Sequence, residues 1–293
     1  MPELSVHFSK KAGAAAGLLI SVLIWGISFP VIKVAVVEVD SLLFINLRFL
    51  LAAALLVSYS ILRRERLTRL LKGRILWIMG VTNGVGFAME VFGLNFTTAT
   101  NASLLVNVNI VFMALFSAIL LGERIKHRAI LGILIGLAGV FLITTDGDLT
   151  ALASGSAIGD AIIFVGGVIW AYSMIYNKRA ATELNLSSME VTESMTIISA
   201  ISLLPFLAFS SFKFNLNFLS VSSILYTAVL CTILGFFLFY KALKTLTVVN
   251  TGMLMLLEIV VAIIVSYAFL GEEMTLIGMF GGALIASGIL LSS

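Results

Sequence analysis

Residues 101–142 read NASLLVNVNIVFMALFSAILLGERIKHRAILGILIGLAGVFL, an apolar run, a polar corner at Gly122–Arg124 and a second apolar run rich in glycine. The same plan returns at residues 250–291 as NTGMLMLLEIVVAIIVSYAFLGEEMTLIGMFGGALIASGILL. One constant offset aligns the two copies and pairs Asn101 with Asn250, Ser117 with Ser266, Gly132 with Gly281 and Gly139 with Gly288. The chain therefore consists of two homologous halves, and function is expected where the halves meet.

The composition indicates a polytopic membrane protein. Hydrophobic residues make up 60% of the 293 residues and charged residues only 11%, against about 45–50% and about 25% in soluble domains. The net charge of +3 is too small and scattered to indicate a nucleic-acid partner. The single Cys231 lies in an apolar run, and His7 and His127 lie in a tail and a loop. We therefore expect no disulfide framework, no metal centre and no cofactor.

Ten apolar segments are long enough to span a bilayer, which takes about 20 residues each. They are residues 12–34, 41–62, 75–97, 101–121, 129–145, 157–177, 188–210, 220–241, 250–270 and 276–291. The first follows Lys10 and Lys11 as a signal peptide would, but it is about twice the usual length of such an apolar region and is expected to be retained. The predicted fold is an all-α integral membrane protein with ten transmembrane helices.

The distribution of basic residues predicts the orientation. Fifteen of the 18 lysines and arginines fall in segments on one side, two on the other, and Arg48 within a span. The positive-inside rule then places both termini in the cytoplasm of a cell membrane. Because each half has an odd number of spans, the second half must enter the membrane upside down. We therefore predict two inverted five-helix repeats, residues 12–145 and 157–291.

Several motifs resemble the EamA type of the drug/metabolite transporter superfamily, which has two five-helix repeats. They are Trp-Gly-x-x-Phe at Trp25–Phe29, Arg-Phe-Leu at Arg48–Leu50, and the Leu-Gly-Glu corners at Leu121–Glu123 and Leu270–Glu272. The family usually has a proline early in spans four and nine, where this chain has Ile110 and Ile259. The resemblance implies transport, often export, of amino acids or other small metabolites.

Three carboxylates lie within predicted spans. A charge at bilayer depth costs about 2.5–3.5 kcal/mol on insertion scales, so it normally faces a cavity or a partner. Glu258 is the deepest and is a candidate for solute binding and proton coupling, or for a structural pair with Lys241. Glu90 is a second candidate for both roles, because Asn83, Phe87 and Glu90 share one helix face that suits a cationic or amphipathic solute. The alternative for this stripe is a hydrogen bond between helices. Glu193 is expected to reach water.

Span four carries further polar candidates for solute binding, Ser103, Asn107 and Asn109, although a neighbouring helix would satisfy an asparagine equally well. Trp25 and Trp170 occupy equivalent positions in the two halves. Both tryptophans and Tyr172 are candidates for a pocket wall, with anchoring in the interfacial belt as the alternative. Arg48 is expected to reach the interface or to bind a helix end.

These features favour a secondary carrier that alternates access through a central cavity, with a small-molecule solute and membrane lipid as its partners. No phosphate-binding loop is present, so ATP is not expected to drive transport directly. Protons or the gradient of the solute itself remain. A channel or a lipid flippase-like protein is the alternative. An intramembrane enzyme is not expected, because the HExxH and GxSxG motifs do not occur and no histidine lies in a span.

Overall fold

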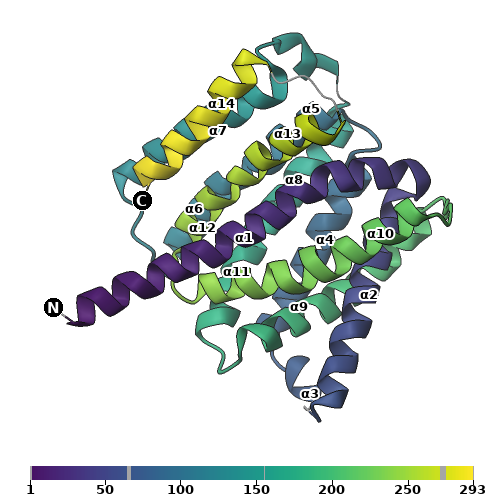
Figure 1. Ribbon diagram of the computed structural model, residues 1–293, viewed down its shortest axis with the longest axis vertical. Helices are drawn as coiled ribbons and strands as arrows, with labels where there is room; N and C mark the ends of the chain where they lie inside the picture. Colours follow the sequence, from purple (N-terminus) through teal and green to yellow (C-terminus); the bar gives the residue numbers. More distant parts are fainter. Residues whose placement is uncertain (1, 65–66, 155, 271–274, 293) are drawn as a thin grey trace.

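The computed structural model describes residues 2–64, 67–154, 156–270 and 275–292, and in these ranges the chain is a helical bundle (Figure 1). The described part contains no β-strand beyond an isolated bridge between Val39 and Phe214. It holds nine helices long and apolar enough to cross a membrane, and a shorter apolar helix, α14 (Leu276–Ser292). With 17 residues, α14 is about 25 Å long. The predicted all-α membrane fold with about ten spanning helices is confirmed.

The spans of the first half are α1 (Pro2–Glu38), α2 (Ser41–Leu62), α4 (Arg74–Gly93), α5 with α6 (Ala99–Asn107 and Asn109–Leu121) and α7 (His127–Thr145). Those of the second half are α8 (Ala157–Thr182), α9 (Ser188–Leu203) with the 3₁₀ turn η2 (Leu204–Phe209), α10 (Phe218–Tyr226) with the π-helix η3 (Thr227–Gly235) and α11 (Phe236–Leu243), α12 (Val248–Met255) with α13 (Leu257–Leu270), and α14. The short elements α3 (Leu67–Leu70) and η1 (Leu149–Ser154) lie in connections.

Helices α7 and α14 lie side by side and run antiparallel (Figure 1). A Cβ added to Gly132 would come within 2.5 Å of the Gly288 carbonyl oxygen, and one added to Gly139 would come equally close to that of Gly281. Gly132 and Gly281 are equivalent in the two halves, as are Gly139 and Gly288. Equivalent glycines of the two halves therefore make the same contact with each other, as a two-fold relation between α7 and α14 would produce.

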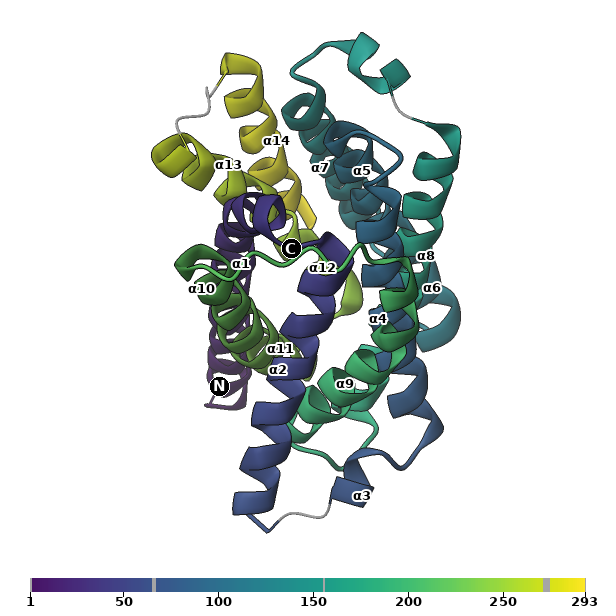
Figure 2. The same ribbon diagram turned by 90° about the vertical axis from the view of Figure 1, so that its right-hand side faces the viewer.

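Close packing also brings α4 of the first half against α9 of the second, which lies between α4 and α2 (Figure 2). A Cβ on Gly80 would meet Ile198 at 2.5 Å, and one on Gly84 would come within 3.0 Å of the Ser199 carbonyl oxygen. The GxxxG spacing at Gly80 and Gly84 thus marks a tight helix crossing. The same spacing at Gly278 and Gly282 does not, because a Cβ on Gly282 would have only ordinary contacts with Val260 at 3.8–3.9 Å.

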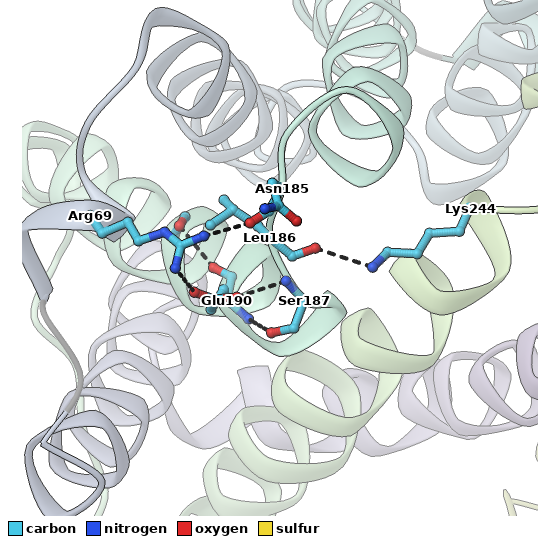
Figure 3. A network of polar contacts seen from close by, with 7 residues as sticks. Arg69, Asn185, Leu186, Ser187, Glu190 and Lys244 are labelled. Atoms are coloured by element: carbon cyan, nitrogen blue, oxygen red, sulfur yellow. Dashed lines mark hydrogen bonds and ion pairs between the residues drawn. The ribbon is translucent and has the colours of Figure 1, made fainter.

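One end of the bundle is tied together by polar contacts between loops (Figure 3). Arg69 of α3 forms an ion pair with Glu190, which also completes the capping box at the start of α9 with Ser187. Lys244 donates to the carbonyl oxygen of Leu186. These contacts join α3, the α8–α9 connection and the end of α11.

The first Leu-Gly-Glu corner joins the two halves at this end. Gly122 ends α6 in the left-handed region at φ 67°, which glycine adopts at little cost. The Glu123 carboxylate accepts from the backbone N–H of Val248, with N–O distances of 3.1 and 3.2 Å, and so caps α12. Gly271 and Glu272 of the second corner lie outside the described residues.

Two helix ends differ from the predicted spans for local reasons. Helix α8 continues to Thr182, past the predicted end at residue 177, because Lys178 is held inside the protein: its Nζ donates to the carbonyl oxygens of Leu243 and Leu246, each at 2.6 Å. The seventh span leaves α-helical geometry at Leu204, since Pro205 has no N–H to donate.

At the opposite end of the bundle, Asp40 caps α2 and accepts hydrogen bonds from the loop that follows η2 in the other half. Its carboxylate accepts from the backbone N–H of Leu42 and Leu43 and from the hydroxyls of Ser210 at 2.8 Å and Ser211 at 2.7 Å. Burial raises the pKa of Asp40, but the hydrogen bonds from Ser211, Ser210 and the backbone outweigh it and lower the pKa to about 2.

The first prediction concerns the α7–α14 contact. Gly288→Ala should lower the thermal unfolding temperature in detergent, because the new Cβ would lie 2.5 Å from the Gly132 carbonyl oxygen and 2.9 Å from the Gly136 nitrogen. Overpacking of this kind costs about 1–3 kcal/mol. Gly282→Ala is the matched control on the same helix and should leave the unfolding temperature unchanged. Equal unfolding temperatures for the two variants would contradict the contact.

The second prediction concerns Asp40. Asp40→Ala should destabilise the protein by about 1 kcal/mol through loss of the cap. Because the folded-state pKa is lowered, the ionised carboxylate stabilises the fold above about pH 4, and this contribution fades as the pH falls towards 2. The difference in unfolding temperature between variant and wild type should therefore shrink over that window. Asp148→Ala is the control, since among the described residues the exposed Asp148 carboxylate accepts only from nearby Thr150. A difference independent of pH would exclude this role for the Asp40 charge.

Candidate functional site

Three charged side chains come together inside the bundle, from helices of both halves. Arg48 lies on α2, Glu90 on α4 and Glu258 in the first turn of α13. The two carboxylates lie within electrostatic range of Arg48, and Glu258 also within range of Glu90. We refer to Arg48, Glu90 and Glu258 as the charged cluster.

Arg48 is held in place inside the protein. Its side chain is only 6% exposed, and its Nε donates to Oγ1 of Thr232 in η3 at 2.8 Å. The guanidinium carbon lies 5.4 Å and 5.6 Å from the ring centres of Phe49 and Phe87. The expectation that Arg48 reaches the interface or binds a helix end was wrong, because the other half supplies a hydroxyl and the neighbouring rings a cation–π surface.

Both carboxylates of the charged cluster lie inside the bundle and are partly accessible. Protein surrounds Glu90 and Glu258, yet each side chain keeps part of its surface accessible. Because an ionised group is costly to expose to lipid, we expect this accessible surface to face an interior space. The predicted partner Lys241 is exposed at the end of α11, and the cation near Glu258 is Arg48 instead.

The structure divides the predicted stripe on α4. Asn83 is fully buried, and its Nδ2 donates to Ser199 Oγ on α9 at 3.2 Å. This is the hydrogen bond between helices that the sequence analysis gave as the alternative to solute binding. Phe87 keeps accessible surface and lies against Arg48. Glu90 lies about one turn from the end of α4, closer to a helix end than expected. Glu193, expected to reach water, is fully buried in α9.

Spans four and nine are both interrupted, and the break in span nine lies two residues before Glu258. The helix breaks at Val108, between α5 and α6, and at Leu256, between α12 and α13. At each break the backbone tightens, with Val111 N bonding to Val108 O and Ile259 N to Leu256 O. The breaks form without the proline usual in the family, at nearly equivalent positions in the two halves. Discontinuous helices of this kind line the binding sites of many carriers.

The polar candidates of span four flank its break. Asn107 ends α5, and its Nδ2 donates to the Ser103 carbonyl oxygen at 2.7 Å. Ser103 and Asn107 both keep accessible surface, whereas Asn109, at the start of α6, is 8% exposed.

The two tryptophans pack in equivalent ways across the halves. Trp25 lies on Gly235, and its Nε1 donates to the Cys231 carbonyl oxygen at 2.8 Å. Trp170 lies on Gly86, the equivalent glycine, and keeps accessible surface that Trp25 lacks. A large side chain at either glycine would displace the indole.

Tyr172 lies away from the charged cluster. Its hydroxyl bonds to that of Tyr176 at 2.9 Å, and its ring meets Phe116 edge to face. It is near the molecular surface, within electrostatic range of Arg74 and Arg179. This placement fits the alternative of anchoring near an interface.

Sequence reasoning missed Phe49, Thr232 and the π-helix η3. The Thr232 hydroxyl donates to the Thr227 carbonyl oxygen at 2.9 Å, five residues back in η3, and accepts from Arg48. A threonine in an apolar run carries no distinctive signal. Arg48 did carry one, since a charge seven residues into a span needs a partner.

Comparisons with known proteins identify the family and the fold of the chain. The model of the EamA-like transporter family matches residues 13–145 and again residues 157–293. An "Uncharacterized transporter" of Archaeoglobus fulgidus is 29% identical over 94% of this chain and 96% of its own. A "Probable amino-acid metabolite efflux pump" of Salmonella typhimurium is 28% identical over 97% of this chain and 95% of its own. A solved crystal structure superposes with a TM-score of 0.81 over 96% of both chains at 18% identity, which shows the fold alone.

The third prediction tests the accessibility of the site. In a Cys231→Ala background, Asn107→Cys should react with a charged, membrane-impermeant thiosulfonate reagent, because the thiolate forms only where water reaches it. Asn83→Cys, at a fully buried position, should react at least about tenfold more slowly. Labelling rates can be followed by mass spectrometry. Similar rates at the two positions would contradict a wet space bordered by span four.

Proposed function

The chain belongs to the EamA-like transporter family, and from this premise we propose that it is a secondary carrier that exports a small metabolite, an amino acid or a related compound. The observation that carries the proposal is the charged cluster, whose deep carboxylates keep accessible surface at the junction of the halves. Family membership indicates a membrane transporter rather than an enzyme. The relative named as an amino-acid metabolite efflux pump supports the solute class and direction.

The proposed mechanism is alternating access between two inverted repeats, residues 12–145 and 157–291. The antiparallel exchange of glycine contacts between α7 and α14 supports this relation. An inverted pair has two conformations in which the halves exchange roles, one open to each side. The excess of basic residues in loops on one side supports cytoplasmic termini in a cell membrane.

The proposed solute site lies between the charged cluster and the broken spans. Phe87, Trp170, Ser103 and Asn107 all keep accessible surface, and we propose them as parts of its wall. Glu258 sits in the first turn of α13, where the partial positive charge of the helix end favours its carboxylate.

Glu90 and Glu258 are the proposed proton-coupling groups. Two carboxylates share one cation, Arg48, so one negative charge of the cluster stays uncompensated when both are ionised. A proton and a positively charged group of the solute would compete for these carboxylates, and each would then exclude the other. Such competition makes the export of solute depend on the entry of a proton.

The fourth prediction tests the coupling in proteoliposomes. An inward proton gradient should accelerate solute export by the wild-type protein, and Glu258→Gln or Glu90→Gln should abolish this acceleration while the protein still folds. The expected loss is about tenfold or more in gradient-driven flux. Glu183→Gln, at an exposed position, is the control and should behave as wild type.

Flux unaffected by the gradient and by both substitutions would remove the coupling proposal. Solute counterflow separates a carrier from the alternatives. A channel would show no counterflow, and a flippase-like protein would scramble labelled phospholipid without competition from soluble compounds.

A further inference from the structure

The Arg48 guanidinium presents hydrogen-bond donors that the protein does not use. A guanidinium has five N–H groups in a planar fork. In the described part of the chain only Nε has an acceptor, the Thr232 hydroxyl, although Arg48 is only 6% exposed. The two terminal Nη atoms have no acceptor among the described residues and retain some accessible surface. A buried charged donor without an acceptor is costly. These N–H groups are therefore free to donate to an acceptor group of a ligand.

The carboxylates of the charged cluster do not fill this role. Glu90 and Glu258 act on Arg48 through electrostatic attraction, but neither forms an ion pair with it in the described structure. Arg48 and the two carboxylates thus lie within electrostatic range of one another without forming an ion pair. A small molecule that carries both charges would offer a partner to each kind of group.

We propose that Arg48 binds the carboxylate of the transported solute, while Glu90 and Glu258 receive its ammonium group. The inference rests on the proposed function and narrows its solute class to zwitterions with a free carboxylate, as in an α-amino acid. A polyamine would leave the guanidinium unpaired, and a dicarboxylate would face Glu90 and Glu258 with like charge.

The surroundings of Arg48 suit it to this task. Phe49 and Phe87 lie near the guanidinium, and the Thr232 hydroxyl, itself oriented by donating to the Thr227 carbonyl oxygen, holds Nε. With Nε occupied, the two Nη groups remain as the edge that a carboxylate can engage through two parallel bonds. Little side-chain freedom is then lost on binding, which favours affinity.

The decisive experiment compares ligands on the wild-type protein. Counterflow in proteoliposomes would be measured for the amino acids, and each one that moves would be compared with its methyl ester and its decarboxylated amine. We expect the free acid to compete about tenfold or more better than either derivative, because both lack the carboxylate that Arg48 would bind. Equal competition by ester or amine would overturn the assignment.

Variants then assign the effect to Arg48. Arg48→Gln should abolish the preference for the free acid, and Arg48→Lys should restore part of it, since lysine keeps the charge but lacks the fork. Arg63→Gln is the control: Arg63 also lies over an aromatic ring, that of Tyr59 at 5.4 Å, but is exposed. If Arg48→Gln fails to fold, the comparison of ligands on the wild type still decides.

The outcomes separate this inference from the proposed function. Transport of a polyamine, nucleoside or sugar, without transport of any amino acid, would overturn the role of Arg48 and leave the carrier intact. Absence of counterflow for every compound of all four classes would overturn the carrier itself.

Discussion

The hydrocarbon core of a bilayer offers no hydrogen-bond partner, so each polar group within a span must find one in the protein. In this chain many of those partners lie in the other half. Ser21 Oγ of α1 donates to the Gly235 carbonyl oxygen at 2.9 Å, and Trp25 Nε1 to that of Cys231. In the reverse direction, Ser173 Oγ of α8 donates to the Met79 carbonyl oxygen at 3.2 Å. Either half alone would lose these hydrogen bonds, so polar groups inside each half depend on the other half.

The duplicated backbone carries a site that is not duplicated. Glycines and tryptophans repeat between the halves and make equivalent contacts, as in the pairs Gly86/Gly235 and Trp25/Trp170. The charges do not repeat, since the offset that aligns these segments places Asn109 opposite Glu258 and Phe239 opposite Glu90. The shared residues support the packing that lets the halves fit together. The differences make the charged cluster asymmetric, with Arg48 and Glu90 from the first half and Glu258 from the second.

The existence of the spans could be predicted because length and apolar composition suffice to place a helix in a membrane. Their interruptions could not. The breaks at Val108 and Leu256 lack proline, and the π-helix η3 carries no sequence signal, since each depends on contacts from neighbouring helices. The candidate site was predicted in part. Glu90 and Glu258 followed from the cost of burying a charge, whereas the placement of Arg48 was mistaken because one helix alone suggests a route to the interface.

By itself, the sequence determined that two homologous halves of apolar helices must lie in a membrane, because its repeat and composition leave no other way to bury so much apolar surface. The tertiary structure decided which polar residues serve packing between helices and which keep accessible surface. Asn83 and Glu90 share one helix face, yet Ser199 of the other half bonds the first, while the second keeps accessible surface. Periodicity places a side chain on a face of its helix. Only the neighbouring helices decide whether that face meets protein, lipid or water.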